Sequence, residues 1–281
     1  MSGLRRIGLA YNPTNPEVAG VLERAKRWCA AHDVATWESQ AEDAHSIGPE
    51  LDGTDLVAIL GGDGTFLRAA RAIGGSAVPA LGVNLGRVGF LAKVETADLE
   101  RVLDQVAAGD YAVEERFRIQ ARLRRTTGGT EEHACVNEVV VARASRVRMI
   151  HLEVEVSGSH LATYVADGVV VATPTGSTAY SFSAGGSILD PRLRNMIITP
   201  VAAYLSPLHS VVAGGDHVVR LTLRAATDGA LLSLDGQADI PLDEGDCVEV
   251  SALERPLRII EPSGSTPFYD LLRTKAGLLP Y

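Results

Sequence analysis

The pattern with the clearest chemical meaning is a glycine-rich loop, Gly61-Gly-Asp-Gly-Thr65. It follows an apolar run, Asp55–Leu60, and precedes a helical pattern over Phe66–Ile73. Glycines let a backbone approach a ligand closely, and free N–H groups at the start of a helix favour an anion. Asp63 would repel a phosphate, so its position predicts a role toward a hydroxyl proton or a metal ion. The alternative is a plain turn in which Asp63 caps the helix.

The same segment argues against two common nucleotide-binding loops. Leu67 stands where the dehydrogenase fingerprint Gly-x-Gly-x-x-Gly has its third glycine. None of the three lysines (Lys26, Lys93 and Lys275) lies between a glycine and a Ser or Thr, so a P-loop is excluded.

A second segment is rich in hydroxyl side chains. An apolar run, Val169–Ala172, leads into a turn at Pro174 and then into Thr175–Ser183. Small hydroxyls beside an aromatic ring suit ribose hydroxyls, amides and phosphate oxygens, whereas a solvated loop is the alternative. A weaker candidate is the adjacent pair Asn137-Glu138, which could read two hydroxyls or an adenine edge but by default is a surface pair.

Strand and helix signals alternate through the first hundred residues, before the hydroxyl-rich segment. The runs that predict strands are Ile7–Ala10, Asp55–Leu60 and Pro79–Val83, and the helical patterns are Pro16–Ala31, Phe66–Ile73 and Ala97–Ala108, the last with Thr96 as its N-cap. This alternation predicts an α/β domain with a Rossmann-like parallel sheet and crossover helices. Near the chain end, Arg258–Ile260 and the amphipathic Asp270–Ala276 could return to this domain.

From Tyr111 onward the pattern changes to short β runs. These runs are Phe117–Leu123, Ala134–Ala142, His151–Val156, Val218–Leu223 and Leu231–Leu234, with possible hairpin turns at Gly128-Gly129, Ser157-Gly158 and Asp228-Gly229. The uncharged stretch 195–215 contains two prolines and is typical of a buried strand-turn-strand rather than a membrane span. The expected domains are residues 1–110, completed by 258–281, and a β-rich domain over 111–257.

Composition narrows the classes of function. The chain has 281 residues and a net charge of −9, which disfavours a nucleic acid as partner because phosphate backbones are repelled. Its three cysteines lie far apart, which indicates neither a disulfide framework nor a metal clip and fits a cytoplasmic location. We expect no membrane partner, and the N-terminus shows no signal-peptide pattern. The long charge-poor β region predicts self-association, because exposed strand edges need cover.

Taken in order, the motifs resemble the NAD kinase family over nearly the whole chain. They are Gly61–Thr65, Asn84-Leu-Gly-Arg-Val-Gly-Phe-Leu91, Asn137-Glu138, Asp167-Gly168, Thr173–Tyr180 and Asp235-Gly-Gln237. The resemblance implies transfer of a phosphate from ATP, or from polyphosphate in some members, to the 2′-hydroxyl of the adenosine ribose of NAD, giving NADP. It also implies an α/β domain followed by a β-rich domain, a swapped chain end, and a homodimer or homotetramer.

Roles follow from the resemblance position by position. Asp63 takes the position of the proton acceptor. The NAD-binding set would be Asp63, Gly64, Arg68, Asn137, Glu138, Arg148, Asp167, Thr175, Thr178, Ala179, Tyr180, Ser181, Phe182, Ser183 and Gln237. Gly61, Gly62, Gly64 and Thr65 would bind the phosphates of ATP, with Arg68, Arg71 and Arg87 as further candidates. Mg²⁺ or another divalent cation would accompany ATP, since no protein metal cage is evident.

The sequence departs from the family pattern at two places. Val165 stands where some members have a basic residue two positions before the Asp-Gly pair, so that contact is missing or supplied elsewhere. The stretch Pro200–His209 differs from the usual Pro-His and Arg-Pro pattern, which puts subunit contacts more than the chemistry in doubt.

Two other functions fit parts of the pattern. Lipid kinases share versions of the Gly-Gly-Asp-Gly-Thr loop, but their usual Gly-Thr-Gly-Asn-Asp stretch and a basic amphipathic helix are both missing from the sequence. A non-catalytic sensor could keep the NAD-binding residues, although the intact Asp63 argues against it.

Overall fold

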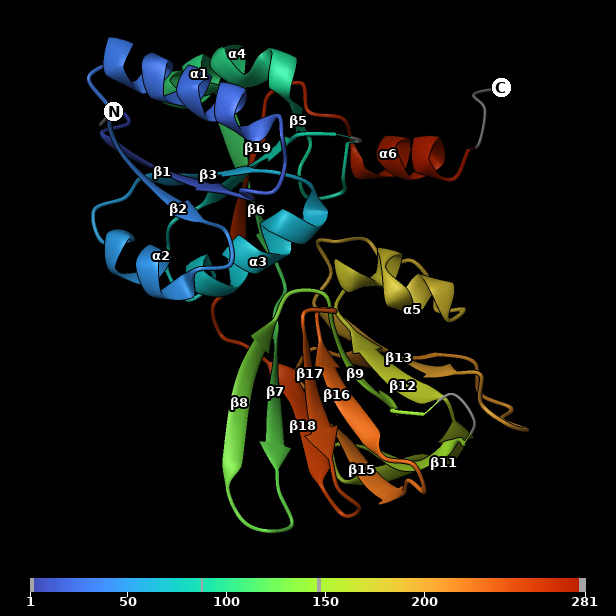
Figure 1. Cartoon of the computed structure of the whole chain (residues 1–281). Coiled ribbons are helices and arrows are strands. Elements are labelled where there is room, and N and C mark those ends of the chain that lie inside the picture. The colour runs from blue at the N-terminus through green and yellow to red at the C-terminus, as the bar shows by residue number, and fades with distance from the viewer. Residues whose placement is uncertain (1–2, 87, 146–147, 278–281) are drawn as a thin grey trace. The chain divides into compact units, whose positions relative to one another are not determined.

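A computed structural model describes residues 3–86, 88–145 and 148–277. The chain forms two compact units (Figure 1). Unit 1 comprises Met1–Glu115 together with Leu257–Tyr281, and unit 2 comprises Arg116–Pro256. Each unit has its own hydrophobic core.

Unit 1 is built on a largely parallel sheet of seven strands. The strands are β1 (Arg6–Tyr11), β2 (Ala35–Gln40), β3 (Leu56–Leu60), β4 (Ala80–Asn84), β5 (Val94–Glu95), β6 (Tyr111–Arg116) and β19 (Leu257–Pro262), in the order β2-β1-β3-β4-β19-β6 with β5 beside β4. All residues of β3 and β4 are buried, as is expected of central parallel strands with both faces covered.

Helices cover both faces of this sheet. The helical elements of unit 1 are α1 (Val18–Ala31), α2 (Ala44–Glu50), α3 (Asp63–Ile73), the 3₁₀ turn η1 (Thr96–Asp98), α4 (Leu99–Ala108) and α6 (Phe268–Lys275). Figure 1 shows α1 and α4 on one face and α2 and α3 on the other. The apolar positions of α1 and α4 enter one core with those of β1, β3 and β4.

Three details of unit 1 differ from the sequence expectation. Helix α3 begins at Asp63 rather than Phe66, because Gly62 adopts the extended conformation that precedes a helix. Thr96 does not cap a long helix; it begins η1, and α4 starts at Leu99. Strand β2 was not anticipated, because it lies at the sheet edge and most of its residues are exposed.

Unit 2 is an antiparallel β structure. One sheet has the order β11-β10-β15-β18-β7-β8 and the other β14-β13-β12-β9-β16-β17. The strands are β7 (Ile119–Arg124), β8 (Thr130–Cys135), β9 (Glu138–Arg143), β10 (Ile150–Val156), β11 (Ser159–Ala166), β12 (Gly168–Ala172), β13 (Asn195–Val201), β14 (Val211–Gly214), β15 (Val219–Ala225), β16 (Ala230–Leu234), β17 (Ala238–Leu242) and β18 (Cys247–Ala252). Apolar side chains from both sheets share one core. A 3₁₀ turn, η2 (Gly176–Thr178), and a short helix, α5 (Tyr180–Ser183), follow β12.

The strand runs predicted for unit 2 were partly wrong. The single run expected over Ala134–Ala142 is two strands, because the chain leaves one sheet after β8 and joins the other at β9. Asp228-Gly229 is a turn but not a hairpin, since it joins β15 to β16 in different sheets. Gly128-Gly129 and Ser157-Gly158 do close hairpins, and the stretch 195–215 forms the antiparallel pair β13–β14. Among the described residues, no helix is long and apolar enough to cross a membrane.

The chain end completes the sheet of unit 1. Strand β19 inserts between β4 and β6 and runs parallel to β4, with Ile259 opposite Ala80. Ile260 is buried in the core that α1 and α4 cover. The fold class expected from the sequence is therefore confirmed: an α/β domain, a β-rich domain, and a chain end that returns to the first.

Truncating the returning strand should destabilise unit 1. We expect Ile260→Ala to lower the free energy of unfolding by about 2–5 kcal/mol, because it removes buried methyl groups and leaves a cavity. Arg258→Ala, on the same strand but exposed, should change it by less than about 1 kcal/mol. Urea unfolding of both variants measures the difference, and equal effects would contradict a core role for β19.

Candidate functional site

The glycine-rich loop of unit 1 joins the carboxyl end of β3 to the start of α3. The N–H of Gly61 donates to the carbonyl of Val83 on β4 (2.9 Å), which ties the loop to the neighbouring strand. A Cβ at position 61 would lie 2.5 Å from the side chain of Thr65, so this position needs glycine. Gly64 is exposed with open space beside it. The loop thus presents the first turn of α3 to solvent, which is the geometry that can receive an anion.

Asp63 holds a second loop by its carboxylate. Oδ2 accepts a hydrogen bond from the N–H of Phe90 (2.9 Å), and Oδ1 accepts from the N–H groups of Leu91 and Ala92 (both 3.0 Å). We call residues 89–92 the amide turn; it is closed by a bond from the N–H of Gly89 to the carbonyl of Ala92 (3.0 Å). A carboxylate has about four acceptor positions, so one remains on Oδ2. Asp63 therefore is not the cap of α3; its carboxylate binds three backbone N–H groups of the amide turn.

Two glycines make room for this arrangement. A Cβ on Gly89 would overlap the carboxylate of Asp63. A Cβ on Gly82 would lie 2.6 Å from the carbonyl oxygen of Leu91 and 3.1 Å from the ring of Phe66. The amide turn thus packs directly on β4 and α3, and Gly89 of the turn and Gly82 of β4 are required by contact rather than by backbone angle.

The arginines proposed near the loop have partners of their own. Arg68 is partly buried; its Nη2 lies 3.5 Å from Oγ1 of Thr65 and its Nε 3.8 Å from Glu42. Arg71 is partly buried on the same helix. Arg87 lies outside the described residues. Of the two described arginines, Arg68 contacts the glycine-rich loop through the hydroxyl of Thr65.

An equivalent carboxylate organises unit 2. Asp235 is buried, and it accepts hydrogen bonds from the N–H groups of Val136 (3.0 Å), Asn137 (2.8 Å) and Glu138 (3.0 Å). It adopts a left-handed conformation (φ 50°) in the loop between β16 and β17. In return, its own N–H donates to the carbonyl of Glu138 (3.0 Å). The chain crosses from one sheet to the other at this point, so Asp235 fixes the position of the Asn137-Glu138 pair.

Glu138 is buried rather than a surface group. Only 6% of it is exposed, and its Oε2 has no hydrogen-bond partner within the protein. Burial, and secondarily the nearby charge of Asp235, raises the pKa of Glu138 to about 8. The Oδ1 of Asn137 is likewise buried and unpartnered. Two polar atoms without partners at adjacent positions are the kind of feature that a ligand could satisfy.

The hydroxyl-rich segment turns most of its buried hydroxyls inward. Thr173 Oγ1 donates to the carbonyl of Val136 (2.6 Å), and Ser177 Oγ donates to that of Pro174 (2.6 Å). The hydroxyl of Ser181 is buried and bonded to Thr199 (3.1 Å). The side chain of Ser181 therefore supports the turn, because hydroxyls in the interior need partners. Its place in the NAD site stays a prediction.

The remaining predicted residues at this end of unit 2 differ in their exposure. Thr175 is buried, with its Oγ1 accepting from Arg116 (3.5 Å). Those that are partly or fully exposed are Thr178, Ala179, Tyr180, Phe182, Ser183 and Gln237. Gly176 packs against the carbonyl of Asn137 so closely that a Cβ would overlap it. Asn137, Glu138, the segment from Thr173 and the Asp235 loop are therefore assembled at one end of the β9–β12 pair.

Asp167 and Arg148 lie at the other end of that pair. Asp167 directly precedes β12, while Glu138 is opposite Ala172 at its far end. Four strand steps, or about 13 Å, separate these ends. Asp167 is held by Arg143, with Nε 2.7 Å from Oδ1 and Nη2 2.9 Å from Oδ2. Arg143 and Asp167 thus form a two-point ion pair, and Arg148 is exposed.

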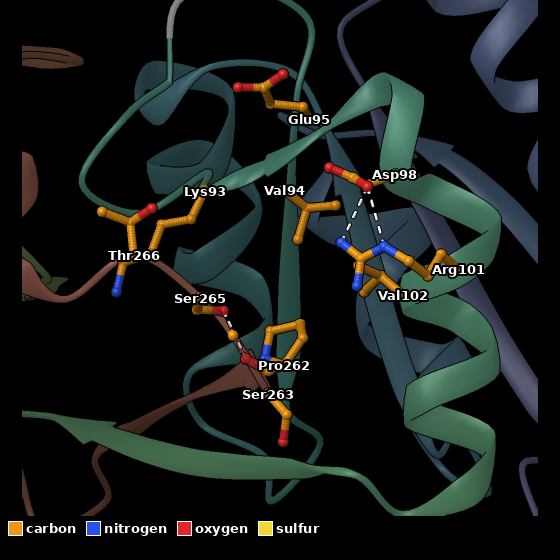
Figure 2. Close-up of a pocket in the computed structure, with 11 residues that line it drawn as sticks. Lys93, Val94, Glu95, Asp98, Arg101, Val102, Pro262, Ser263, Ser265 and Thr266 are labelled. Atoms are coloured by element: carbon orange, nitrogen blue, oxygen red, sulfur yellow. Dashed lines mark hydrogen bonds and ion pairs between the residues drawn. The ribbon is translucent and has the colours of Figure 1, made fainter.

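In the described part of the chain, no cluster of three or more His, Cys, Asp or Glu side chains could hold a metal ion. Burial raises the pKa of Cys29 to about 11 and also raises that of Cys247, which disfavours their thiolates. A pocket of about 140 Å³ in unit 1 lies between the start of α4 and the segment that follows β19, and none of its lining residues belongs to the predicted site (Figure 2).

Comparison with known proteins agrees with this architecture. A solved structure of a yeast NADH kinase complexed with NADH superposes with a TM-score of 0.83 at 24% identity, covering 99% of this chain and 88% of that one. An NAD kinase from Archaeoglobus fulgidus in complex with ATP gives a TM-score of 0.79 at 24% identity, over 98% of this chain and 100% of the other. At this identity the likeness establishes the fold, which is that of these kinases.

Sequence similarity then establishes the family. Residues 7–111 match the ATP-NAD kinase N-terminal domain, and residues 136–262 match the ATP-NAD kinase C-terminal domain. The NAD kinase of Magnetococcus marinus is 38% identical over 97% of this chain and 93% of its own length. That of Heliobacterium modesticaldum is 38% identical over 96% and 97%. The chain belongs to the NAD kinase family, so the resemblance inferred from its motifs is confirmed.

The contact between Gly89 and Asp63 can be tested by adding one methyl group. Gly89→Ala should lower the free energy of unfolding by about 1–3 kcal/mol, because the new Cβ and the carboxylate cannot share the space. Gly86→Ala is the matched control, since a Cβ there meets nothing within 4 Å. Urea unfolding compares them; a Gly89→Ala protein as stable as Gly86→Ala would contradict the packing described.

The raised pKa of Glu138 predicts a pH-dependent stability. Between about pH 4.5 and 8 the folded protein keeps a proton that the unfolded chain has lost, so stability should fall as the pH rises. From pH 5 to 8 the loss should be on the order of 4 kcal/mol. Glu138→Gln removes this term, so the difference between wild type and variant in urea unfolding should change over that range. A constant difference would show that Glu138 does not titrate there.

Proposed function

We propose that this chain transfers the terminal phosphate of ATP to the 2′-hydroxyl of the adenosine ribose of NAD, giving NADP. The observation that carries the proposal is the match of both family domains, together with near full-length relatives that are named NAD kinase. The structures with similar folds are described as complexes with NADH and with ATP, which are ligands of the two classes that this reaction needs.

Asp63 is proposed to accept the proton of the ribose hydroxyl. A hydroxyl is a weak nucleophile at neutral pH, and a positioned base typically contributes ~10²–10⁴-fold. The acceptor position left on Oδ2 could take a hydrogen bond from such a hydroxyl, while the three N–H bonds keep the carboxylate from rotating. Phosphoryl transfer depends mostly on positioning and charge stabilisation, so a fixed carboxylate suits the reaction.

The phosphates of ATP are assigned to the glycine-rich loop. The first turn of α3 and the glycines at 61, 62 and 64, with Thr65, would offer N–H groups to phosphate oxygens. Arg68 could add a positive charge, because its guanidinium lies beside Thr65. Mg²⁺ would arrive on the phosphate oxygens of ATP, which are ligands that this cation prefers, and would neutralise their charge.

NAD binding is assigned chiefly to the unit 2 residues already named. The unpartnered Oδ1 of Asn137 and Oε2 of Glu138 support this assignment, because ribose hydroxyls and adenine amines are donors that could pair with them. Tyr180 and Phe182 expose aromatic surface that could cover a base. Asp167 precedes the far end of the β9–β12 pair, about 13 Å along the sheet, a separation that an extended dinucleotide could span.

Several finer points belong to the proposal as well. Polyphosphate could replace ATP as donor, since the glycine-rich loop is assigned to phosphate groups rather than to the adenine base. A homodimer or homotetramer is proposed, for which the exposed apolar side chains of Tyr204 and Leu205 offer surface to cover. A cytoplasmic location would supply both substrates.

The reaction and the role of Asp63 as its general base are tested by one activity assay on wild type, Asp63→Asn and a control variant. Wild type should form NADP from NAD and Mg-ATP, and Asp63→Asn should lose at least about 10²–10⁴-fold in kcat, because the amide cannot accept the proton and cannot accept all three N–H bonds of the amide turn. NAD affinity, measured by calorimetry, should persist in the variant. Gln105→Ala, a change at a partly exposed residue of α4 outside the predicted site, is the control for handling.

The other outcomes identify the competing functions. NADP formed with polyphosphate but not with ATP would keep the reaction and change the donor. NAD binding without NADP from either donor would indicate a sensor. Phosphorylation of a lipid in place of NAD would overturn the proposal, as would full activity in Asp63→Asn for the role of that residue.

A further inference from the structure

The amide turn is attached to the returning chain end at two places, which we call its flanks: Phe90, within the turn, and Lys93, which follows it directly. On the first flank, the ring of Phe90 packs against Phe268 of α6, with centroids 5.8 Å apart and planes tilted by 46°. The ammonium of Lys275, on the same helix, lies 5.1 Å from the centre of the Phe90 ring. The residue whose N–H holds Oδ2 of Asp63 therefore also carries the side chain on which α6 rests.

On the second flank, Lys93 follows the turn directly. Its Nζ lies 2.7 Å from Glu261 of β19 and 4.0 Å from Glu114 of β6. These side chains are only 11%, 16% and 18% exposed, so their attraction is screened less than at a surface. Figure 2 shows Lys93 beside Thr266 of the segment Pro262–Thr266, which leads from β19 to α6; both line the unit 1 pocket.

From this arrangement we propose that Phe268 and Glu261 are positioning residues for Asp63, acting through the amide turn. The inference rests on the proposed function, in which Asp63 touches the substrate hydroxyl. The turn itself is outside the regular strands, and its contacts with the rest of unit 1 include Asp63, β4 and these two flanks. Loss of a flank would let the three N–H groups shift, and the carboxylate would shift with them.

The expected cost follows from the geometry of the reaction. A misplacement of about 1 Å in a reacting group can cost ~10²-fold in rate, although nothing that binds the substrate is removed. Loosening the turn should therefore lower kcat while KM for NAD stays nearly constant. It should also speed exchange of the N–H groups of Phe90, Leu91 and Ala92 with solvent, because local opening exposes them.

The experiment compares substitutions on the chain end with a matched control on the same helix. Phe268→Ala removes the ring contact, and Phe268→Leu restores part of its bulk. Glu261→Gln removes the nearer of the two carboxylate charges that face Lys93 while keeping an acceptor. Arg273→Ala is the control, since Arg273 is exposed and pairs with Asp270 of its own helix. Each full-length protein is assayed for NADP formation with Mg-ATP, and amide exchange is followed by NMR without substrates.

We expect Phe268→Ala and Glu261→Gln each to lose about tenfold or more in kcat, with KM for NAD within about twofold of wild type. Exchange at the three amides should quicken by a similar factor. Phe268→Leu should recover part of both losses, and Arg273→Ala should match wild type in both.

Two results would overturn the inference: unchanged amide exchange in both variants, or faster exchange with unchanged kcat. If wild type forms no NADP, the proposed function fails, but the exchange measurement still decides whether the chain end holds the turn. If Phe268→Ala does not fold, Phe268→Leu and Glu261→Gln carry the same comparison.

Discussion

Two aspartate carboxylates, each accepting hydrogen bonds from three consecutive backbone N–H groups, hold the irregular segments of this protein. Asp63 does so for residues 90–92 in unit 1 and Asp235 for residues 136–138 in unit 2. A buried N–H without a partner costs about 1–3 kcal/mol, so segments that leave a sheet need such an acceptor. Bonds to a charged acceptor are roughly twice as strong as neutral ones, which lets one side chain replace a strand partner.

This constraint explains where glycine is required. Next to the three N–H groups that Asp63 holds, a Cβ on Gly89 would overlap the carboxylate, so the backbone can approach this closely only with glycine at position 89. In unit 2 the same closeness occurs between Gly176 and the carbonyl of Asn137. At these two positions, which lie between strands, contacts with residues distant in sequence require glycine. The regular sheets fix where those contacting residues lie.

The fold class was predictable because long periodic signals determine it. β3 and β4 are fully buried, and their sequences are apolar runs that predict strands. α1 and α4 are amphipathic, and the spacing of their apolar residues predicts helices. The site was predictable only as a set of motifs. Glu138 resembled a surface pair because nothing local shows its burial, and Asp235 was missed as an organiser because its partners lie almost a hundred residues away. A polar residue beside a glycine after an apolar strand was the one signal that could have indicated it.

The two carboxylates differ in what their environment leaves them to do. Asp235 is buried beneath the pair that it positions, and its charge helps to keep a proton on Glu138, so its influence on a ligand would pass through that neighbour. Asp63 is only partly buried and retains an acceptor position on Oδ2, so the same group can anchor the turn and meet a substrate hydroxyl. Removing the Asp63 carboxylate therefore removes two things at once. Only changes that leave the carboxylate in place and loosen what holds it can separate anchoring from proton acceptance, which is why the contacts of the amide turn matter to the chemistry.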